Sequence, residues 1–128
     1  MLRVQGRYEK ALTAFRDRVV KELGDRVDSI VVYGSMAKGE AREESDVDML
    51  IISDRKGEIR DRVFEIGYDI DLEHDVAMSL VFLGPEEVEQ RVRVGSPFIE
   101  DILINGLILY DRDETFQGIR GRVLKASR

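Results

Sequence analysis

Two aspartates, Asp46 and Asp48, occupy alternate positions of the stretch DVDMLII, and the preceding apolar run ends at Gly34 and Ser35. If DVDMLII is a strand, both carboxylates project from one face, with Cα atoms roughly 7 Å apart. Two bare carboxylates at that separation repel each other, and a hard divalent cation would remove the repulsion. Mg²⁺ commonly binds one or two protein carboxylates together with substrate phosphates and water.

The Gly34-Ser35 pair could supply the phosphate-binding half of such a site. A glycine lets a phosphate approach the backbone, a helix beginning after it offers free N–H groups, and the Ser35 hydroxyl adds a donor. Carboxylates for a metal beside donors for a phosphate predict a phosphoryl-transfer site whose substrate is a metal-bound nucleotide.

Each feature taken alone has a simpler structural explanation. A Gly-Ser pair after a strand is usually only a turn, and Asp-x-Asp is usually a solvated strand end. Residues 34–39 have the glycine spacing of a P-loop, but Glu40-Ala41 stands where Lys and Ser/Thr are required. The stretch DVDMLIISD lacks the glycine and the oxygen ligands of a calcium loop. His74, the only histidine, is flanked by acidic residues, which favours a surface role.

The elements that must position these residues follow from hydrophobic periodicity. Amphipathic spacing from Tyr8 to Leu23 predicts a helix that Gly24 ends. Apolar runs predict strands at residues 27–33, 47–52, 76–83 and 107–110. Further helices are predicted at residues 36–43, 59–70, from 85 onward and at 97–105, with one frayed helix after 111. Strands alternating with helices predict an α/β domain with one sheet.

Composition limits the class of protein. A length of 128 residues is typical of a single domain, here 1–128, with room for a core. The formal net charge of −6 argues against general nucleic-acid binding, which favours a basic face. The chain has no cysteine, which excludes disulfides and thiolate metal sites. No apolar run approaches the ~20 residues that span a bilayer, and no signal sequence is recognisable, so we expect a cytoplasmic protein without a membrane partner.

The joint spacing of these residues resembles the signature of the minimal nucleotidyltransferases, a family of the DNA polymerase β-like superfamily. The string GS-x-x-x-G-x-x-x-x-x-SD-x-D is matched here by Gly34, Ser35, Gly39, Ser45, Asp46 and Asp48. The resemblance covers residues 8 to about 110 and leaves 111–128 as a C-terminal tail. It implies a nucleotidyltransferase palm, with a mixed sheet of about four strands flanked by helices.

The same resemblance implies roles for the matched residues. Asp46 and Asp48 would be the catalytic residues and would hold Mg²⁺ or Mn²⁺, while Gly34, Ser35 and Ser45 would bind the nucleotide. Active members of the superfamily usually carry a third carboxylate on a later strand. Here that strand reads VAMSLVFL, and Ser79 is the expected occupant of the place. The acidic residues just before it, Asp69 to Asp75, are expected at a helix end or in a loop.

The family also suggests a partner. Minimal nucleotidyltransferases resemble the antitoxin half of toxin–antitoxin pairs whose other member is a small all-helical HEPN-type protein. One hypothesis is transfer of a nucleoside monophosphate, AMP by preference, from an NTP–Mg²⁺ complex such as ATP to a hydroxyl of that partner. The alternative is a catalytically degenerate protein that neutralises the partner by binding alone. An accidental motif match and a homo-oligomer both stay open, and the apolar stretch 97–110 is either core or partner surface.

Overall fold

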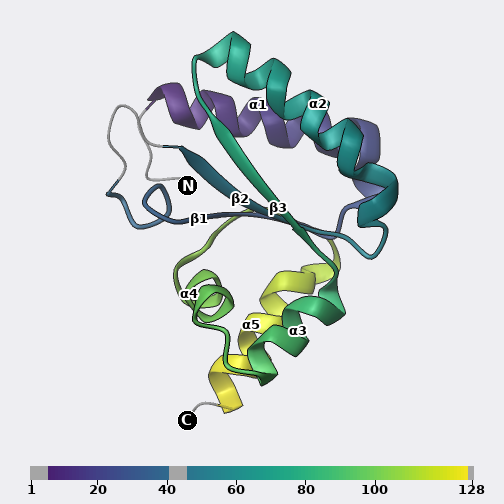
Figure 1. Cartoon of the computed structure of the whole chain (residues 1–128), viewed down its shortest axis with the longest axis vertical. Coiled ribbons are helices and arrows are strands. Elements are labelled where there is room, and N and C mark those ends of the chain that lie inside the picture. The colour runs from purple at the N-terminus through teal and green to yellow at the C-terminus, as the bar shows by residue number, and fades with distance from the viewer. Residues whose placement is uncertain (1–5, 41–45, 127–128) are drawn as a thin grey trace.

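The computed structural model describes residues 6–40 and 46–126, which form four strands and five α-helices (Figure 1). Two short 3₁₀ turns, Gly24–Arg26 and Arg112–Glu114, follow α1 and β4. In chain order the main elements are α1 (Gly6–Leu23), β1 (Ser29–Tyr33), β2 (Val47–Ile52), α2 (Lys56–His74), β3 (Met78–Leu83), α3 (Pro85–Arg93), α4 (Pro97–Asn105), β4 (Leu107–Asp111) and α5 (Thr115–Ala126).

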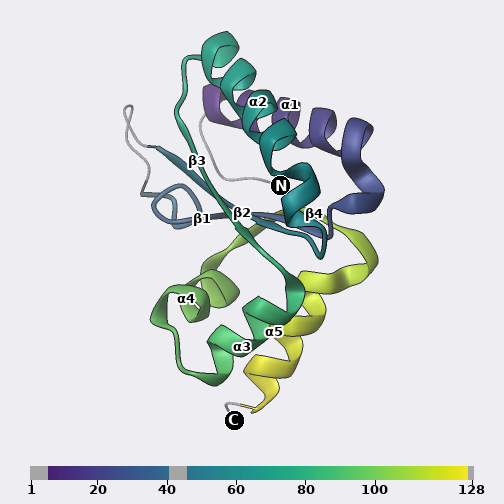
Figure 2. The same cartoon turned by 45° about the vertical axis from the view of Figure 1, so that its right-hand side comes forward.

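The four strands form one mixed sheet in the order β3-β2-β1-β4 (Figure 2). β1 pairs antiparallel with both β2 and β4, whereas β2 and β3 are parallel. A parallel pair needs a long crossover connection, and α2 supplies it. The predicted α/β class and the mixed sheet of four strands are therefore confirmed, with β3 and β4 at the two edges.

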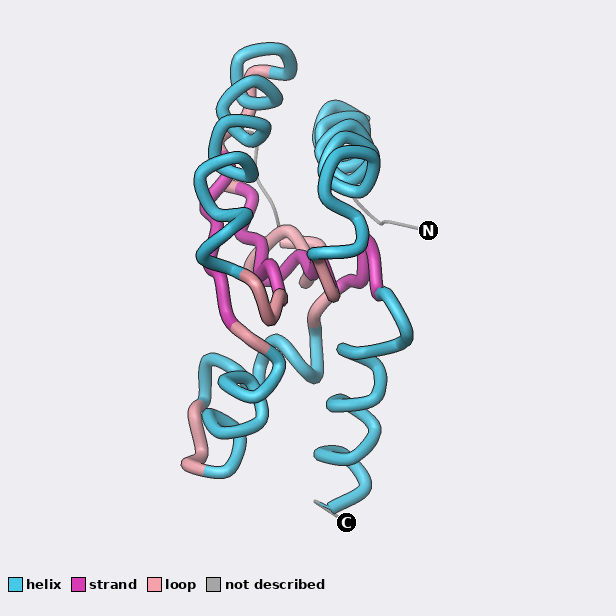
Figure 3. The backbone as a smooth tube through the Cα atoms, turned by 90° about the vertical axis from the view of Figure 1, so that its right-hand side faces the viewer, coloured by secondary structure: helices cyan, strands magenta, loops and turns pink. Residues whose placement is uncertain are grey.

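Helices cover both faces of this sheet, α1 and α2 on one side and α3, α4 and α5 on the other (Figures 1 and 3). Alternate residues of β2 supply the two cores: Val47, Met49 and Ile51 pack with the α1–α2 layer, and Leu50 and Ile52 with the opposite layer. Each fully buried side chain of this size stabilises the fold by about 1.5–3 kcal/mol. The alternation places the even-numbered residues of β2 on the α3–α5 face.

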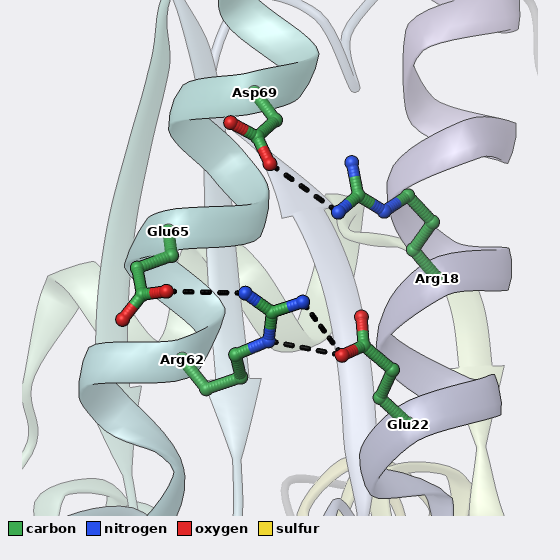
Figure 4. A network of polar contacts seen from close by, with 5 residues as sticks. All are labelled: Arg18, Glu22, Arg62, Glu65 and Asp69. Atoms are coloured by element: carbon green, nitrogen blue, oxygen red, sulfur yellow. Dashed lines mark hydrogen bonds and ion pairs between the residues drawn. The ribbon is translucent and has the colours of Figure 1, made fainter.

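Ion pairs join α1 to α2 along their exposed sides (Figure 4). Arg62 binds Glu22 at 2.6 Å and Glu65 at 3.1 Å, and Arg18 binds Asp69 at 3.3 Å. These side chains are partly solvated, so each pair contributes only about 0.2–1 kcal/mol. Buried apolar residues therefore supply most of the stability of the α1–α2 contact.

The boundaries of two strands lie inside the predicted runs. β1 starts at Ser29 because the Val27 N–H donates to the Gly24 carbonyl and closes the 3₁₀ turn. β3 starts at Met78 because Asp75 ends α2 in a left-handed conformation, with φ 54°. Across the described ranges, no helix combines the length and the apolar composition that crossing a bilayer requires.

The C-terminal segment is part of the core, which corrects the prediction of a frayed helix after residue 111. Phe116 and Ile119 of α5 are buried in the α3–α5 layer. The Asp111 carboxylate accepts hydrogen bonds from the backbone N–H groups of Phe116 and Gln117, at 2.8 and 3.0 Å. These contacts fix the start of α5, and the core therefore extends beyond residue 110.

Candidate active site

Asp48 lies near the start of β2, between the two neighbouring strands. It pairs with Tyr33 at the end of β1 and with Ser79 near the start of β3. Its side chain shares the face of Leu50, which the α3–α5 layer covers further along the strand. Asp46 is exposed and directly precedes β2. The strand that carries Asp48 thus lies beside the strand ending at Tyr33, as the spacing predicts.

Gly34 brings the turn after β1 against the Asp48 carboxylate. Gly34 has φ 74°, a conformation that side chains disfavour, and a Cβ atom on it would lie 2.6 Å from Asp48 Oδ2. Both the backbone conformation and the close approach therefore require glycine. The group that approaches Gly34 in this structure is the Asp48 carboxylate, and the approach of a phosphate stays a prediction.

The predicted helix at 36–43 is wrong over its described part, because residues 34–39 form a turn. Gly39, with φ 71°, reverses the chain only five residues after Gly34, which leaves no room for a helix. Residues 41–43 and Ser45, the third predicted nucleotide contact, lie outside the described residues.

The turn nevertheless begins like a helix. The Lys38 N–H donates to the Gly34 carbonyl at 3.2 Å, and the Glu40 N–H donates to the Ser35 carbonyl at 2.9 Å. Within the described part of the chain, no hydrogen bond uses the N–H groups of Ser35, Met36 and Ala37. Three successive free N–H groups are the feature by which a helix N-terminus binds an anion. The turn can therefore supply the phosphate donors for which a helix was expected.

The pKa values of Asp48 and Tyr33 are shifted from their usual values. Burial, and then the charge of Asp46, raise the pKa of Asp48 above its usual value. Burial, and then the charge of Asp48, raise the pKa of Tyr33. A cation bound between Asp46 and Asp48 would oppose these shifts, because it stabilises the ionised carboxylates. Their oxygen atoms are ligands of the kind that Mg²⁺ prefers.

The residue of β3 opposite Asp48 is a serine. Ser79 stands opposite Asp48 in the parallel register and shares its face of the sheet with Val81 and Leu83, which contact the α3–α5 layer. Within the described residues, no group of three acidic, histidine or cysteine side chains could hold a metal ion. Ser79 thus lies on this strand, opposite Asp48, as predicted.

Asp71 lies nearer to the site than its position in the sequence suggests. It belongs to the last turns of α2, as expected of a helix-end residue, and its Oδ1 atom accepts a hydrogen bond from the Met78 N–H at 3.1 Å. The pKa of Asp71 is raised above its usual value. Burial is the main cause and the charge of Asp46 adds to it, while the hydrogen bond from the Met78 N–H opposes the rise. No sequence signal marks this proximity, since it arises from the way α2 returns to the start of β3.

Contacts from α4 complete the surroundings of the two aspartates. The Tyr33 and Phe98 rings meet edge to face, with centroids 5.2 Å apart. Lys38 in the turn pairs with Asp101 of α4 at 3.3 Å. Sequence reasoning missed both contacts, and the only available signal was the position of Tyr33 directly before Gly34. Phe98 is still 44% exposed, so an apolar ring is accessible beside the site.

Comparison with known proteins agrees with this geometry. The family model described as nucleotidyltransferase domain matches residues 12–110, which include the Gly34 turn, both aspartates and Ser79. The chain belongs to this family. The resemblance inferred from the motif is therefore confirmed.

Two relatives are predicted protein adenylyltransferases of Methanocaldococcus jannaschii. MJ1305 is 31% identical over 120 residues, which cover 88% of this chain and 78% of the relative. MJ0604 is 28% identical over 102 residues, which cover 80% of this chain and 97% of the relative.

Solved structures share the fold of this nucleotidyltransferase domain. A crystal structure of a toxin–antitoxin with AMP-PNP has a TM-score of 0.55 at 16% identity, covering 88% of this chain and 86% of that one. A mutant of the toxin–antitoxin MntA-HpeT has a TM-score of 0.56 at 15% identity, with the same coverage. At these identities the likeness shows the fold alone.

Proposed function

We propose that this chain transfers a nucleoside monophosphate, AMP by preference, from an NTP–Mg²⁺ complex to a hydroxyl group of a partner protein. The observation that carries the proposal is the contact between the Gly34 turn and Asp48, which joins a set of free N–H groups to a carboxylate pair. Membership of the nucleotidyltransferase family and the predicted adenylyltransferase activity of its relatives support the same chemistry.

In this proposal each residue of the site has its own role. Asp46 and Asp48 would hold Mg²⁺, which when bound neutralises charge on the carboxylates and on the triphosphate. The N–H groups after Gly34 and the Ser35 hydroxyl would bind phosphate oxygens and orient the α-phosphorus. The acceptor oxygen would then bond to that phosphorus while its proton passes to solvent water, and the bond to the departing pyrophosphate would break. Ser79 cannot take up the acceptor proton as a carboxylate would, so we expect slow transfer.

The partner in this proposal is a small helical protein of the HEPN type, and the pair would act as toxin and antitoxin. The toxin–antitoxin structures that share this fold, MntA-HpeT among them, support this role by analogy of fold.

A second candidate function is favoured by one observation, the hydroxyl at Ser79 opposite Asp48. A site with two carboxylates can bind NTP–Mg²⁺ without activating the acceptor. The chain would then neutralise its partner by binding alone.

Labelled ATP separates the two functions. The chain, its co-expressed helical partner, Mg²⁺ and α-labelled ATP are incubated, and the partner is analysed by mass spectrometry for an added nucleotide. On the transfer hypothesis the wild type labels the partner, Asp48→Asn abolishes labelling while leaving the complex intact, and Ser79→Asp labels equally or faster. If all three neutralise the partner equally without a nucleotide on it, transfer is refuted and the binding function stands.

A further inference from the structure

β3 is an edge strand, and its hydrogen-bonding pattern fixes which groups face outward. The Val47 N–H donates to the Ala77 carbonyl at 2.8 Å, and the Ser53 N–H donates to the Leu83 carbonyl at 3.0 Å. In a parallel pair, every second residue of a strand directs both its backbone N–H and its C=O toward the neighbouring strand. Ala77 and Leu83 bond in this way, so the odd-numbered residues of β3 bond to β2. The even-numbered residues direct their backbone groups toward the open edge.

Two residues on this edge offer a complete set of free backbone groups. The Met78 N–H is already satisfied by the Asp71 carboxylate. Within the described residues, Leu80 and Phe82 have no partner for their outward N–H and C=O groups. Unpaired strand edges are templates for pairing with another strand, and natural proteins usually block them with charges, prolines or bulges. The outward positions of β3 carry Met, Leu and Phe instead.

An apolar stripe lies beside this edge on α2. Phe64, Tyr68 and Leu72 recur every four residues, and their exposed fractions are 40%, 64% and 68%. A hollow of about 320 Å³ lies along the contact between α2 and β3. It is lined by Phe64, Gly67, Tyr68, Asp71, Met78 and Leu80. Large apolar side chains grouped around a hollow are typical of a protein interface.

The stripe carries opposite charges at its two ends. Arg60 begins it, with its guanidinium 5.3 Å from the centroid of Phe64 and 5.5 Å from that of Phe82. Asp71 lies at the other end, against Met78. The middle of the stripe lies over the middle of β3, since a Cβ atom on Gly67 would lie 3.4 Å from Leu80. The stripe and the edge therefore share one centre, with a cation at one end and an acid at the other.

We propose that two copies of this chain form a two-fold dimer by antiparallel pairing of their β3 edges. Leu80 would pair with Phe82 of the partner subunit, and by symmetry Phe82 would pair with the partner's Leu80. These two pairs would satisfy the outward N–H and C=O groups of both residues in both copies. The same axis lays the two α2 stripes against each other in antiparallel orientation, with Arg60 facing the partner's Asp71.

The charge pattern favours a second copy over an unrelated protein. In an isologous interface the same surface patch of both copies meets across a two-fold axis. The patch must therefore be complementary to itself, so that if one residue contacts a second across the axis, the second contacts the first in the same way. The Arg60–Asp71 polarity, centred on the same axis as the edge groups of Leu80 and Phe82, meets this requirement. The dimer would extend the sheet across both copies and leave the Asp48 face open, because α2 lies on the opposite face.

A pair of matched surface variants tests the dimer. Tyr68→Glu places a charge in the stripe, and Ile104→Glu places one on α4, where Ile104 is 63% exposed against 64% for Tyr68. Mass is measured by sedimentation equilibrium over a concentration series, and backbone protection by hydrogen exchange. The wild type is expected at twice the 14.7 kDa chain mass, with slow exchange at Leu80 and Phe82.

Tyr68→Glu is expected to weaken the dimer on the order of 100-fold or more, because a charge is buried in two copies per interface. It should also restore fast exchange at Leu80 and Phe82, with an unchanged circular dichroism spectrum. Ile104→Glu should remain dimeric. A wild type that stays at 14.7 kDa up to about 100 μM overturns the proposal. So does a dimer that Ile104→Glu dissociates, since the interface would then be the hollow lined by Leu103, Ile104 and Leu124.

Discussion

Replacing Gly34 by alanine tests the contact on which the site depends. The substitution forces a side chain into a backbone with φ 74° and puts its Cβ atom 2.6 Å from Asp48 Oδ2. Gly39 provides a matched control, because its φ is 71° but a Cβ atom there meets nothing within 4 Å. Both substitutions carry the same backbone strain and the same change in the unfolded chain, so their difference isolates the contact with Asp48.

The magnitude can be worked out term by term. A left-handed conformation costs a non-glycine residue about 1–2 kcal/mol, and loss of glycine's freedom in the unfolded chain offsets about 0.4–1 kcal/mol of that. Forcing the half-buried Asp48 side chain away from the new methyl group adds about 1–3 kcal/mol. For a chain of this length each kcal/mol lowers Tm by about 4 °C. Gly34→Ala should therefore melt roughly 4–12 °C below Gly39→Ala.

Thermal unfolding followed by circular dichroism measures the difference, and calorimetry with ATP and Mg²⁺ measures its effect on the site. Gly39→Ala should keep nucleotide binding close to wild type, whereas Gly34→Ala should lose it because Asp48 has moved. Equal melting temperatures for the two variants would show that the turn does not press on Asp48 in solution. The account of the site would then be refuted, even if binding were weakened in both.

Three further predictions concern charge. Mg²⁺ should raise the Tm of the wild type, and Asp46→Asn combined with Asp48→Asn should abolish that rise in a thermal melt, because the paired carboxylates are gone. The pKa of Asp48 is raised in the folded state, so its contribution to stability is fully present below its unfolded pKa and is lost as pH rises through the folded value. Without metal, the free energy of unfolding of the wild type should fall relative to Asp48→Asn over that pH range in urea titrations. Arg120 donates to two backbone carbonyls at 2.7 and 2.8 Å and lies over the Phe116 ring, so Arg120→Ala should cost about 2 kcal/mol in urea unfolding. Arg122→Ala, which removes an exposed ion pair, should cost under about 1 kcal/mol.

Periodicity predicted most of the fold because each element buries one regular face. The 3.6-residue pattern of α1 and the apolar run of β2 both reappear within a residue or two of their predicted bounds. The run at 97–105 also forms a helix, whose Ile99, Ile102 and Leu103 are buried and whose Ile104 is exposed. Local patterns failed where tertiary contacts decide. Phe116 reads as one aromatic in a polar tail, and only the closing of the α3–α5 layer makes it core.

The site was predictable as a pair of aspartates beside a glycine, but not in its detail. Short-range spacing indicated that Asp46 and Asp48 share a face and that Gly34 lets a phosphate approach the backbone, but not that Gly34 lies against Asp48. The proximity of Asp71 to Asp46 depends on the length of α2, and the contact of Phe98 with Tyr33 depends on where α4 docks. No local sequence pattern indicates either contact. The roles of these residues in binding and transfer stay predictions.

The register between β2 and β3 suggests how metal and nucleotide binding are related in this domain. A third carboxylate opposite Asp48 would raise the electrostatic cost of the empty site and hold a metal firmly on its own. Ser79 at that place leaves two carboxylates, and the charge of Asp46 contributes to the raised pKa of Asp48 after burial. Two carboxylates fill only part of a Mg²⁺ shell, so the phosphates of the nucleotide must supply other ligands. We therefore expect Mg²⁺ and ATP each to bind weakly alone and to increase the affinity for the other by the same factor, because coupling between two binding events is reciprocal.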